Sequence, residues 1–434
     1  MSGRLVSVDR DTPYLLPPSV QEWLPENHLA RFVVVIVARV DLGARTRAYR
    51  GRGSDAFHPA MLVALVFYGY ATGVFSSRKL ERETYDSVAV HYVAATRHPE
   101  HDTIANFRKH LLAKLSAAFV QILSVARQLG VRKVGKVSLD GTKIHANASQ
   151  HRALSWEHAN KIEAHVRAEV EQLMHVAEAA DAGEVPDGMS VPEELRRREL
   201  QRREQRLAAI AQAKAQIEAR AVERYARERA AYDQKLAERQ AQEERNGRTP
   251  GGPSPAPQPK DQVNLTDADA RIMPTNGGGF EQAYNAQAVV DTDTMLIVAQ
   301  HASQHAHDQQ EVRAALENLD AVAAVVGTPA ALIADNGYFS ADNVGACHAH
   351  QVEPYLAVGR DAHYPALAQR LRTPAGRAVY ALRKCTVEPT FGIIKSVLGF
   401  RQFLPRGLPA VRHEWTSVCI GWNLQRLHRL SRVA

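Results

Sequence analysis

The stretch GKVSLDGTKI at residues 135–144 marks the point where the character of the chain changes. It is short, carries β-branched residues and is bounded by glycine, so it predicts a β-strand, and we expect Asp140 to close this strand as the last residue of VSLD. The segment AALIAD (330–335) repeats the pattern, with Asp335 at its end and turn residues behind it. An acid at the end of an apolar strand lies at the rim of a sheet, where α/β proteins place their sites. The alternative is an ordinary turn former or helix cap.

A third acid changes the balance between these alternatives. Glu388 lies in CTVEPTFGIIKSVLGF (385–400), where Pro389 predicts the first turn of a helix and Lys395 falls two turns later on the same face. A first-turn Glu favoured by the helix dipole is the plainer interpretation. Three acids that converge on one point would repel each other and need metal ions. Two Mg²⁺ ions, held by carboxylates and substrate phosphates, activate a nucleophile and stabilise a leaving oxygen.

The chain around these acids alternates strands and helices. Strands are predicted at FEQAYNAQAVVD (280–291), MLIVAQHAS (295–303) and VEPYLAV (352–358), and a helix at 309–326. Residues 135–154 and 261–434 therefore predict one α/β domain with a mixed five-stranded sheet, interrupted by a large insertion.

Helices dominate the chain before residue 135 and within the insertion. Residues 1–134 predict an all-α N-terminal domain for DNA binding or assembly, with helices at 29–40, 59–74 and 103–129 and N-caps at Ser77 and Asp102. Residues 155–260 form the insertion. The part to about residue 246 is rich in Ala, Glu, Arg and Gln and predicts a helical hairpin or coiled coil. Residues 181–192 separate its two helices, and Ser190 with Glu193 forms a capping box at the start of the second helix. Residues 247–260 read GRTPGGPSPAPQPK and predict a linker that cannot pack.

Composition limits the class of protein. The chain has 434 residues, a net charge of +7 and three widely spaced cysteines, which argues against a disulfide scaffold and favours the cytoplasm. We expect no signal peptide, and we interpret the uncharged stretch 56–77 as a buried helix, with a membrane segment as the alternative. Residues 360–434 carry 13 Lys or Arg against three acids. Such a stripe attracts polyanions, although a solvated basic surface is an equal alternative.

Taken in order, the motifs resemble the DDE transposases of bacterial insertion sequences, and the resemblance covers nearly the whole chain. The motifs are FHPAMLVALVFYGYATGVFSSRKLE (57–81), HPEHDTIANFRKH (98–110), VSLDGTKIHANAS (137–149), ADARIMPTNGGGFEQAYNAQAVVD (268–291), IADNGYFS (333–340), YALRKCTVEPTFGIIKSVLGFRQFLPRG (380–407) and CIGWNLQRL (419–427). Each alone is a weak signal, but their common order is specific.

The resemblance implies an RNase H-like fold, with Asp140 on the first strand, Asp335 on the fourth and Glu388 on a C-terminal helix. It implies an enzyme that cleaves DNA at transposon ends and joins the 3′-OH to target DNA, using two Mg²⁺ or Mn²⁺ ions held by these three acids. Relatives carry a Tyr–Arg–Glu–Lys set, which maps here to Tyr380, Arg383, Glu388 and Lys395. Four residues separate Arg383 from Glu388, where many relatives have three.

The partners implied are double-stranded DNA, both the terminal inverted repeats and the target, and a second copy of the chain, so that the protein acts at least as a dimer. The expected location is the cytoplasm, at the nucleoid and not in a membrane. Candidate DNA contacts, beside Tyr380 and Arg383, are Ser77, Arg78, Lys79, Asn285, Gln287, Arg401 and Arg406.

Several of these residues have plainer interpretations. Asn285 and Gln287 alternate on one face of a strand, where ordinary sheet polarity explains them nearly as well. The cluster HASQHAHD (301–308) suggests a metal site or, more simply, a strand end and helix cap. Trp415 and Trp422 suggest core packing ahead of base stacking. A non-catalytic DNA-binding relative remains the rival function, and a coiled-coil scaffold explains only the insertion.

Overall fold

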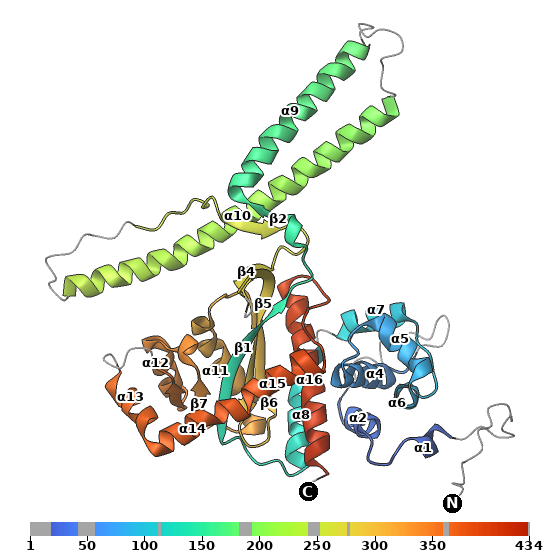
Figure 1. Cartoon of the computed structure of the whole chain (residues 1–434), viewed down its shortest axis with the longest axis vertical. Helices are drawn as coiled ribbons and strands as arrows, with labels where there is room; N and C mark the ends of the chain where they lie inside the picture. Colours follow the sequence, from blue (N-terminus) through green and yellow to red (C-terminus); the bar gives the residue numbers. More distant parts are fainter. Residues whose placement is uncertain are drawn as a thin grey trace, which may run out of the picture.

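A mixed β-sheet forms the centre of the molecule in the computed structural model, which describes residues 19–41, 57–111, 114–181, 193–241, 252–275, 278–358 and 364–432 (Figure 1). The strand order is β4-β5-β1-β7-β8, and β6 pairs with β5 as well. The prediction of five strands was one short, because residues 271–274 add a strand to the end of the long β5. The strands are β1 (Lys136–His145), β4 (Arg271–Pro274), β5 (Phe280–Asp291), β6 (Ile297–Ser303), β7 (Ala331–Ala334) and β8 (Glu353–Leu356).

The register of β1 positions two of the predicted acids. β1 pairs with antiparallel β5 as far as His145, but with parallel β7 only as far as Ser138, which lies opposite Ile333. The prediction that Asp140 ends its strand was therefore wrong, since the β5 ladder carries β1 five residues further. Continued by two residues, the parallel register would set Asp140 opposite Asp335. Both acids thus lie where two parallel strands part.

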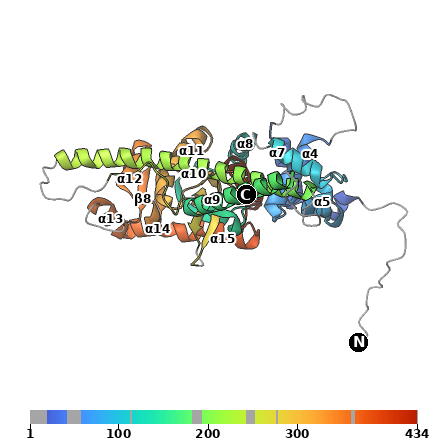
Figure 2. The ribbon, with the colours of Figure 1, turned by 90° about the horizontal axis from the view of Figure 1, so that it is seen from above.

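Helices cover both faces of the sheet. Figure 2 shows α11 (Glu311–Val326) on one side and α14 (Pro374–Cys385) with α15 (Val387–Gly392) on the other. α14 contacts β7 and β8, and α15 contacts β1 and β5. After α15 the chain winds one π-helical turn, Ile393–Val397, before the last helix, α16 (Leu408–Leu430). Within the described ranges this part also contains η2 (Gln150–Arg152), η3 (Asp308–Gln310), η4 (Asn336–Tyr338), α12 (Ala341–Ala349) and α13 (Pro365–Arg372).

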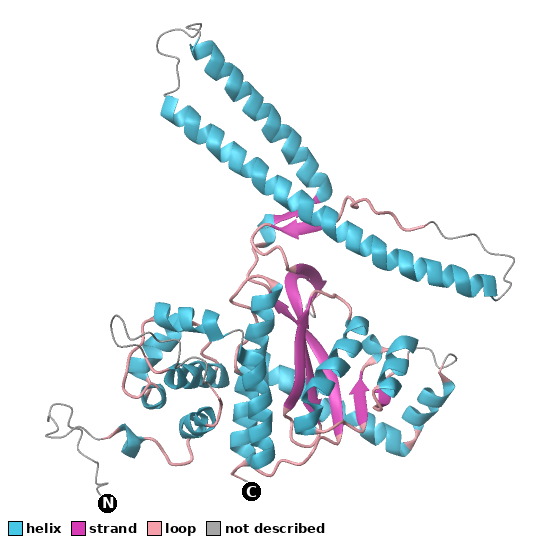
Figure 3. Ribbon diagram, turned by 180° about the vertical axis from the view of Figure 1, so that it is seen from behind, coloured by secondary structure: helices cyan, strands magenta, loops and turns pink. Residues whose placement is uncertain are grey.

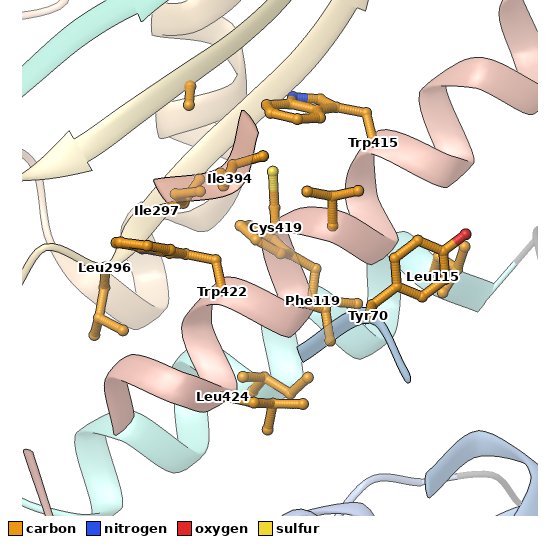
Figure 4. Close-up of a cluster of buried hydrophobic side chains, with 14 of the residues drawn as sticks. Tyr70, Leu115, Phe119, Leu296, Ile297, Ile394, Trp415, Cys419, Trp422 and Leu424 are labelled. Atoms are coloured by element: carbon orange, nitrogen blue, oxygen red, sulfur yellow. The ribbon is translucent and has the colours of Figure 1, made fainter. Parts of the chain in front are cut away.

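Helix α16 is the main packing element of the core. Figure 4 shows Trp415, Cys419 and Trp422 on α16 gathered with apolar residues from several other segments. Both tryptophans are almost fully buried, and their indole N–H groups donate to the carbonyl oxygens of Gln287 and Met295 at 2.9 and 2.8 Å. The core-packing interpretation of these residues is confirmed, because neither face is free to stack on a base.

The N-terminal helices share one continuous apolar core with the sheet. The predicted helix at 103–129 is two helices, and Ser76, not Ser77, holds the N-cap position of α5. Helix α7 likewise starts one residue before Asp102. The helices are α1 (Val20–Trp23), α2 (Leu29–Ala38), α4 (Pro59–Thr72), α5 (Ser77–Asp86), α6 (Val88–Val93), α7 (His101–Leu111) and α8 (Leu115–Gln128).

The uncharged stretch 56–77 contributes a core helix. Nearly all of α4 is buried against its neighbours, as expected from its composition. Within the described ranges, no single helix is long and apolar enough to cross a membrane; two pairs of helices, each sharply bent at a break, reach the necessary length and composition only together.

A buried polar triad fastens the N-terminal helices to α16. Glu414 accepts hydrogen bonds from the Tyr70 hydroxyl at 2.9 Å and the Leu404 amide at 2.8 Å, and it pairs with Arg108 at 3.1 Å. Burial raises the pKa of Glu414, and the Arg108 charge opposes that rise. Loss of Glu414 would leave the Tyr70 hydroxyl without its acceptor, and loss of Arg108 would leave a buried carboxylate without its counter-ion.

The insertion forms a helical arm that projects from the body (Figure 3). It consists of α9 (Trp156–Asp181) and the long α10 (Glu193–Ala241), and its base is a two-stranded sheet of β2 (Ala153–Ser155) and β3 (Gln262–Asn264). The first part of α10 runs beside α9, and the second part continues past the start of α9 across the body (Figure 1). A small apolar cluster of its own, which includes Ile210 and Ile217, holds the base together. The predicted capping box at Ser190 lies outside the described residues.

The end of the linker packs against the arm, contrary to the prediction. The Pro259 carbonyl accepts a hydrogen bond from the Glu157 amide, and the Ala256 carbonyl accepts one from Arg224. Backbone carbonyl groups need partners whatever the side chains are, and here the Glu157 amide of α9 and the Arg224 side chain of α10 supply them. Residues 242–251 lie outside the described part of the chain.

The separate core of the arm predicts that it can be removed. Replacing residues 156–261 by a short Gly/Ser turn between β2 and β3 should leave one cooperative thermal transition, with Tm lowered by no more than about 5 °C. The reason is that the main core contains no residue of α9 or α10. Differential scanning calorimetry of the shortened and full-length chains measures this; loss of the transition would show that the arm is part of the core.

Candidate active site

Three carboxylates converge on one guanidinium group. Nη2 of Arg383 lies 3.8 Å from Oδ2 of Asp140, 3.8 Å from Oδ2 of Asp335 and 3.4 Å from Oε1 of Glu388. The side chain of Arg383 is only 12% exposed, whereas those of Asp335 and Glu388 are 41% and 45% exposed. The structure therefore brings the three predicted acids together at the surface end of a buried cation.

A helix break aligns Arg383 with Glu388. In a continuous helix, positions five residues apart point about 140° away from each other. Here α14 ends at Cys385, and Thr386 leaves the helical region with φ −121° and ψ −83° before α15 begins. The break brings both side chains to one point. Glu388 lies in the first turn of α15, as predicted from Pro389.

Asp140 is the most enclosed of the three acids. Burial raises its pKa to about 6, while the Gly141 amide and the Arg383 guanidinium act in the opposite direction. The Gly141 N–H donates to its Oδ1 at 2.8 Å. Asp335, by contrast, follows the last residue of β7 and caps η4 by accepting from the Gly337 amide at 2.8 Å. The two aspartates thus enter the site from neighbouring strands in different environments.

A fourth carboxylate, Asp308, stands behind Asp140. Its Oδ1 accepts from Lys143 at 2.8 Å, from Asn285 at 2.7 Å and from Gln287 at 2.9 Å. Asn285 and Gln287 are fully buried on β5, opposite Lys143 and Gly141 of β1, so the prediction that they contact DNA was wrong. Gln287 Oε1 also accepts from the buried Tyr338 hydroxyl at 2.6 Å. These amides therefore orient a carboxylate network.

The sequence did not single out Asp308 or Lys143 for this position. Asp308 follows β6 in the histidine-rich segment, and only the fold of that segment brings it to β1. The alternation of Asn285 and Gln287 on β5 is the signal that points to a polar partner here.

Two histidines of that segment, His301 and His305, contact a different carboxylate, that of Glu311. Nε2 of His301 lies 2.6 Å from Glu311, and Nδ1 of His305 lies 2.9 Å from it. Burial would raise the pKa of Glu311, but hydrogen bonds from His301, His305 and Ser303 outweigh it and lower the pKa to about 2. The cluster is thus a strand-end and helix-start network, which accords with the plainer of the two predictions.

Lys395 reaches the site from the π-helical turn. Its Nζ donates to the Thr142 hydroxyl at 3.0 Å, two residues beyond Asp140 on β1. Burial and the nearby Arg401 charge lower the pKa of Lys395. Tyr380 lies beside Arg383, whose Nη1 donates to its hydroxyl at 3.2 Å. Two members of the predicted set, Tyr380 and Lys395, therefore flank the acids.

Four of the other candidate DNA contacts are exposed arginine or lysine side chains. Arg401 and Arg406 are exposed and donate to the carbonyls of Lys395 and Asn147 at 3.1 Å. Arg78 and Lys79 are exposed on α5, and Ser77 lines a cavity between the N-terminal helices and α16. No described contact joins these three to Asp140, Asp335 or Glu388, the acids of the candidate site.

The donor set suits hard divalent cations. Carboxylate oxygens are the protein ligands that Mg²⁺ and Mn²⁺ prefer, and three of them already surround one positive atom. No group of three or more His, Cys, Asp or Glu within the described ranges is spaced to hold a metal ion by itself. Arg383 fills the centre here, so a metal ion and this guanidinium compete for the same oxygens.

Two family models match the chain. The model of the transposase DDE domain matches residues 254–424, and that of the transposase domain DUF772 matches residues 18–110. The first match contains Asp335, Glu388 and Lys395, whereas β1 with Asp140, and most of the arm, lie between the two. No curated protein and no solved structure matches the chain significantly.

The close packing around β1 predicts that residue 141 must be glycine. A Cβ atom at Gly141 would overlap the side-chain amide of Gln287 and touch Asn285. Gly141→Ala should therefore displace the amides that hold Asp308 and destabilise the fold by about 1–3 kcal/mol. Thermal unfolding measures the change.

The matched control is Gly345→Ala on α12, where an added Cβ meets no atom within 4 Å and helix propensity favours alanine. Equal melting temperatures for the two variants would show that the packing at Gly141 is not restrictive.

Proposed function

We propose that this chain, which belongs to the DDE transposases of insertion sequences, cleaves DNA at the ends of its element and joins the freed 3′-OH to target DNA. The observation that carries the proposal is the convergence of Asp140, Asp335 and Glu388 on a single point. Nothing in a purely DNA-binding protein requires three acids at one place, because carboxylates repel the phosphate backbone.

The fold supports the same proposal. In the order β6-β5-β1-β7-β8, β5 runs antiparallel to both of its neighbours, β6 and β1, whereas β1, β7 and β8 are parallel. With helices on both faces and acids at the β1–β7 divergence, this arrangement agrees with an RNase H-like domain of residues 135–154 and 261–434. Residues 1–134 would then be the helical DNA-binding or assembly domain, and 155–260 the inserted arm.

Each residue of the site has a role in this proposal. Asp140, Asp335 and Glu388 would hold two Mg²⁺ or Mn²⁺ ions, which supply activation of the attacking oxygen and charge stabilisation of the leaving one. Arg383 offsets part of the negative charge of the three acids, and it presents its guanidinium to a phosphate once metal ions bind the carboxylates. Lys395 holds a positive charge beside Thr142, on the strand that carries Asp140. Tyr380 orients Arg383.

DNA would reach this site along basic surface. Arg401 and Arg406 follow Lys395 on an exposed segment, and Arg78 and Lys79 are exposed on α5. We assign these side chains, with Ser77, to phosphate contacts at the element's ends or at the target. A transposase that holds two ends together acts at least as a dimer, so a second copy of the chain is the expected partner.

The first functional prediction concerns the acids. Asp140→Ala, Asp335→Ala and Glu388→Ala should each abolish metal-dependent cleavage of a terminal-repeat oligonucleotide, because each removes a ligand. Binding of the same oligonucleotide should persist within about threefold, since phosphate contacts lie elsewhere. Gel assays measure cleavage and binding separately.

The control is Glu317→Ala, which removes an exposed carboxylate of α11. Cleavage at the wild-type rate by any of the three variants would remove that acid from the site. A wild-type protein that binds the repeat and cuts nothing would favour the non-catalytic relative.

The second functional prediction concerns Lys395. Lys395→Ala should slow strand transfer about tenfold to a hundredfold, because a charge-assisted hydrogen bond contributes roughly 1–3 kcal/mol. Lys395→Arg should recover part of the rate, since the charge matters more here than the shape of the group. Single-turnover strand transfer at fixed salt measures both.

Lys384→Ala provides the matched control, because it removes an exposed lysine from α14 close to the same site. Unchanged transfer in Lys395→Ala, or an equal loss in Lys384→Ala, would contradict a specific role for Lys395.

A further inference from the structure

A basic cleft lies where the arm crosses the body. It has a volume of about 510 Å³ and is bounded by α10, the start of β3, strand β4 and the loop after β6. Five Lys or Arg side chains line it against two acids, Glu223 and Asp261. The cations are Arg220, Arg224, Arg227, Lys260 and Arg271.

The positive charge of this cleft is poorly compensated. Arg224 pairs with Asp261 through two contacts of 2.7 Å, which cancels that one charge. Arg220 donates to the carbonyls of Gln262 and Ala268, and Arg271 donates to three backbone carbonyls. Neutral carbonyl groups fix a guanidinium in place without neutralising it.

The two buried guanidinium groups of the cleft, those of Arg220 and Arg271, lie close enough for one to affect the pKa of the other. Burial, reinforced by the charge of Arg220, lowers the pKa of Arg271 to about 10. At the mouth of the cleft, Arg227 and Lys260 are exposed, and neither has an ion-pair partner among the described contacts. The cleft thus combines two rigid cations inside with two free cations at its edge.

The cleft is a short distance from the acids. His305 lines it, and Asp308, three residues later, lies close enough to Asp140 for its charge to contribute to the raised pKa of Asp140. Three residues of extended chain span at most about 10 Å. A DNA strand whose reacting phosphate lies at the acids therefore brings phosphates a few nucleotides away within reach of the cleft.

We propose that this cleft binds the phosphate backbone of duplex DNA, so that the arm and the sheet together clamp the substrate. The ligand class follows from the charge excess, from the fixed guanidinium groups, which fork onto phosphate oxygens, and from the nearness of the acids. The proposal rests on the function proposed above. It assigns the base of the arm, which the acids do not need for chemistry, to substrate binding.

The test compares two double variants that remove the same charge. Arg227→Ala with Lys260→Ala removes the exposed cations of the cleft. The control, Lys161→Ala with Arg167→Ala, removes two exposed cations of α9 that pair with Glu157 and Glu163. Binding of a fluorescent duplex of about 30 base pairs is measured by anisotropy without divalent metal, from about 50 to 200 mM salt.

The cleft variant should bind about tenfold more weakly at 100 mM salt, and the slope of log K against log salt should fall by about one to two, since each lost phosphate contact removes about 0.9. The control should change affinity less than about twofold. Equal slopes for the two variants would overturn the proposal. A cleavage assay of the wild-type protein separates this failure from failure of the proposed function. If the wild type cuts DNA and the cleft variant binds DNA normally, only the proposal that the cleft binds DNA is contradicted.

Discussion

The arrangement of the molecule follows from the need to hold three carboxylates at one point. Asp140 and Asp335 each lie 3.8 Å from one nitrogen of Arg383, so their oxygens are at most about 7.6 Å apart. At that distance two negative charges repel by about 2 kcal/mol or more at an effective dielectric constant of 20. A cation at the centre is therefore required, and Arg383 supplies it in this structure. The divergence of β1 from β7 and the helix break at Thr386 deliver the four side chains to that point.

The rest of the fold makes that point rigid. Trp415 on α16 donates to the backbone of Gln287, and the side chain of Gln287 holds Asp308 behind the site. The same helix carries Glu414, which ties the N-terminal helices to the sheet through Tyr70 and Arg108. A buried helix thus connects the helical N-terminal part, the sheet and the site in one packed unit. The arm is attached to this unit at its base, through the β2–β3 pair and the small apolar cluster that includes Ile210 and Ile217.

Sequence patterns predicted the strands, the arm and the three acids, because alternation, glycine and strand-terminal acids are local signals. The predictions from sequence were wrong where a feature depends on contacts between segments that are far apart in the chain. The position of Asp140 inside β1 depends on how far β5 extends the ladder, and strand β4 exists only because β5 has spare length. Asp308 looked like a helix cap until the fold brought it to Lys143. The packing of the linker end depends on Arg224 of α10 and on the Glu157 amide of α9, which are both distant in sequence.

The central claim is that the acids form a cation-binding centre from which Arg383 can be displaced. An anomalous difference map from crystals grown with Mn²⁺ and a short duplex tests it most directly. The account predicts anomalous peaks between the carboxylates of Asp140, Asp335 and Glu388, with the Arg383 guanidinium moved from the centre to a phosphate. Arg383 still in contact with all three acids, with no peak beside them, would contradict it.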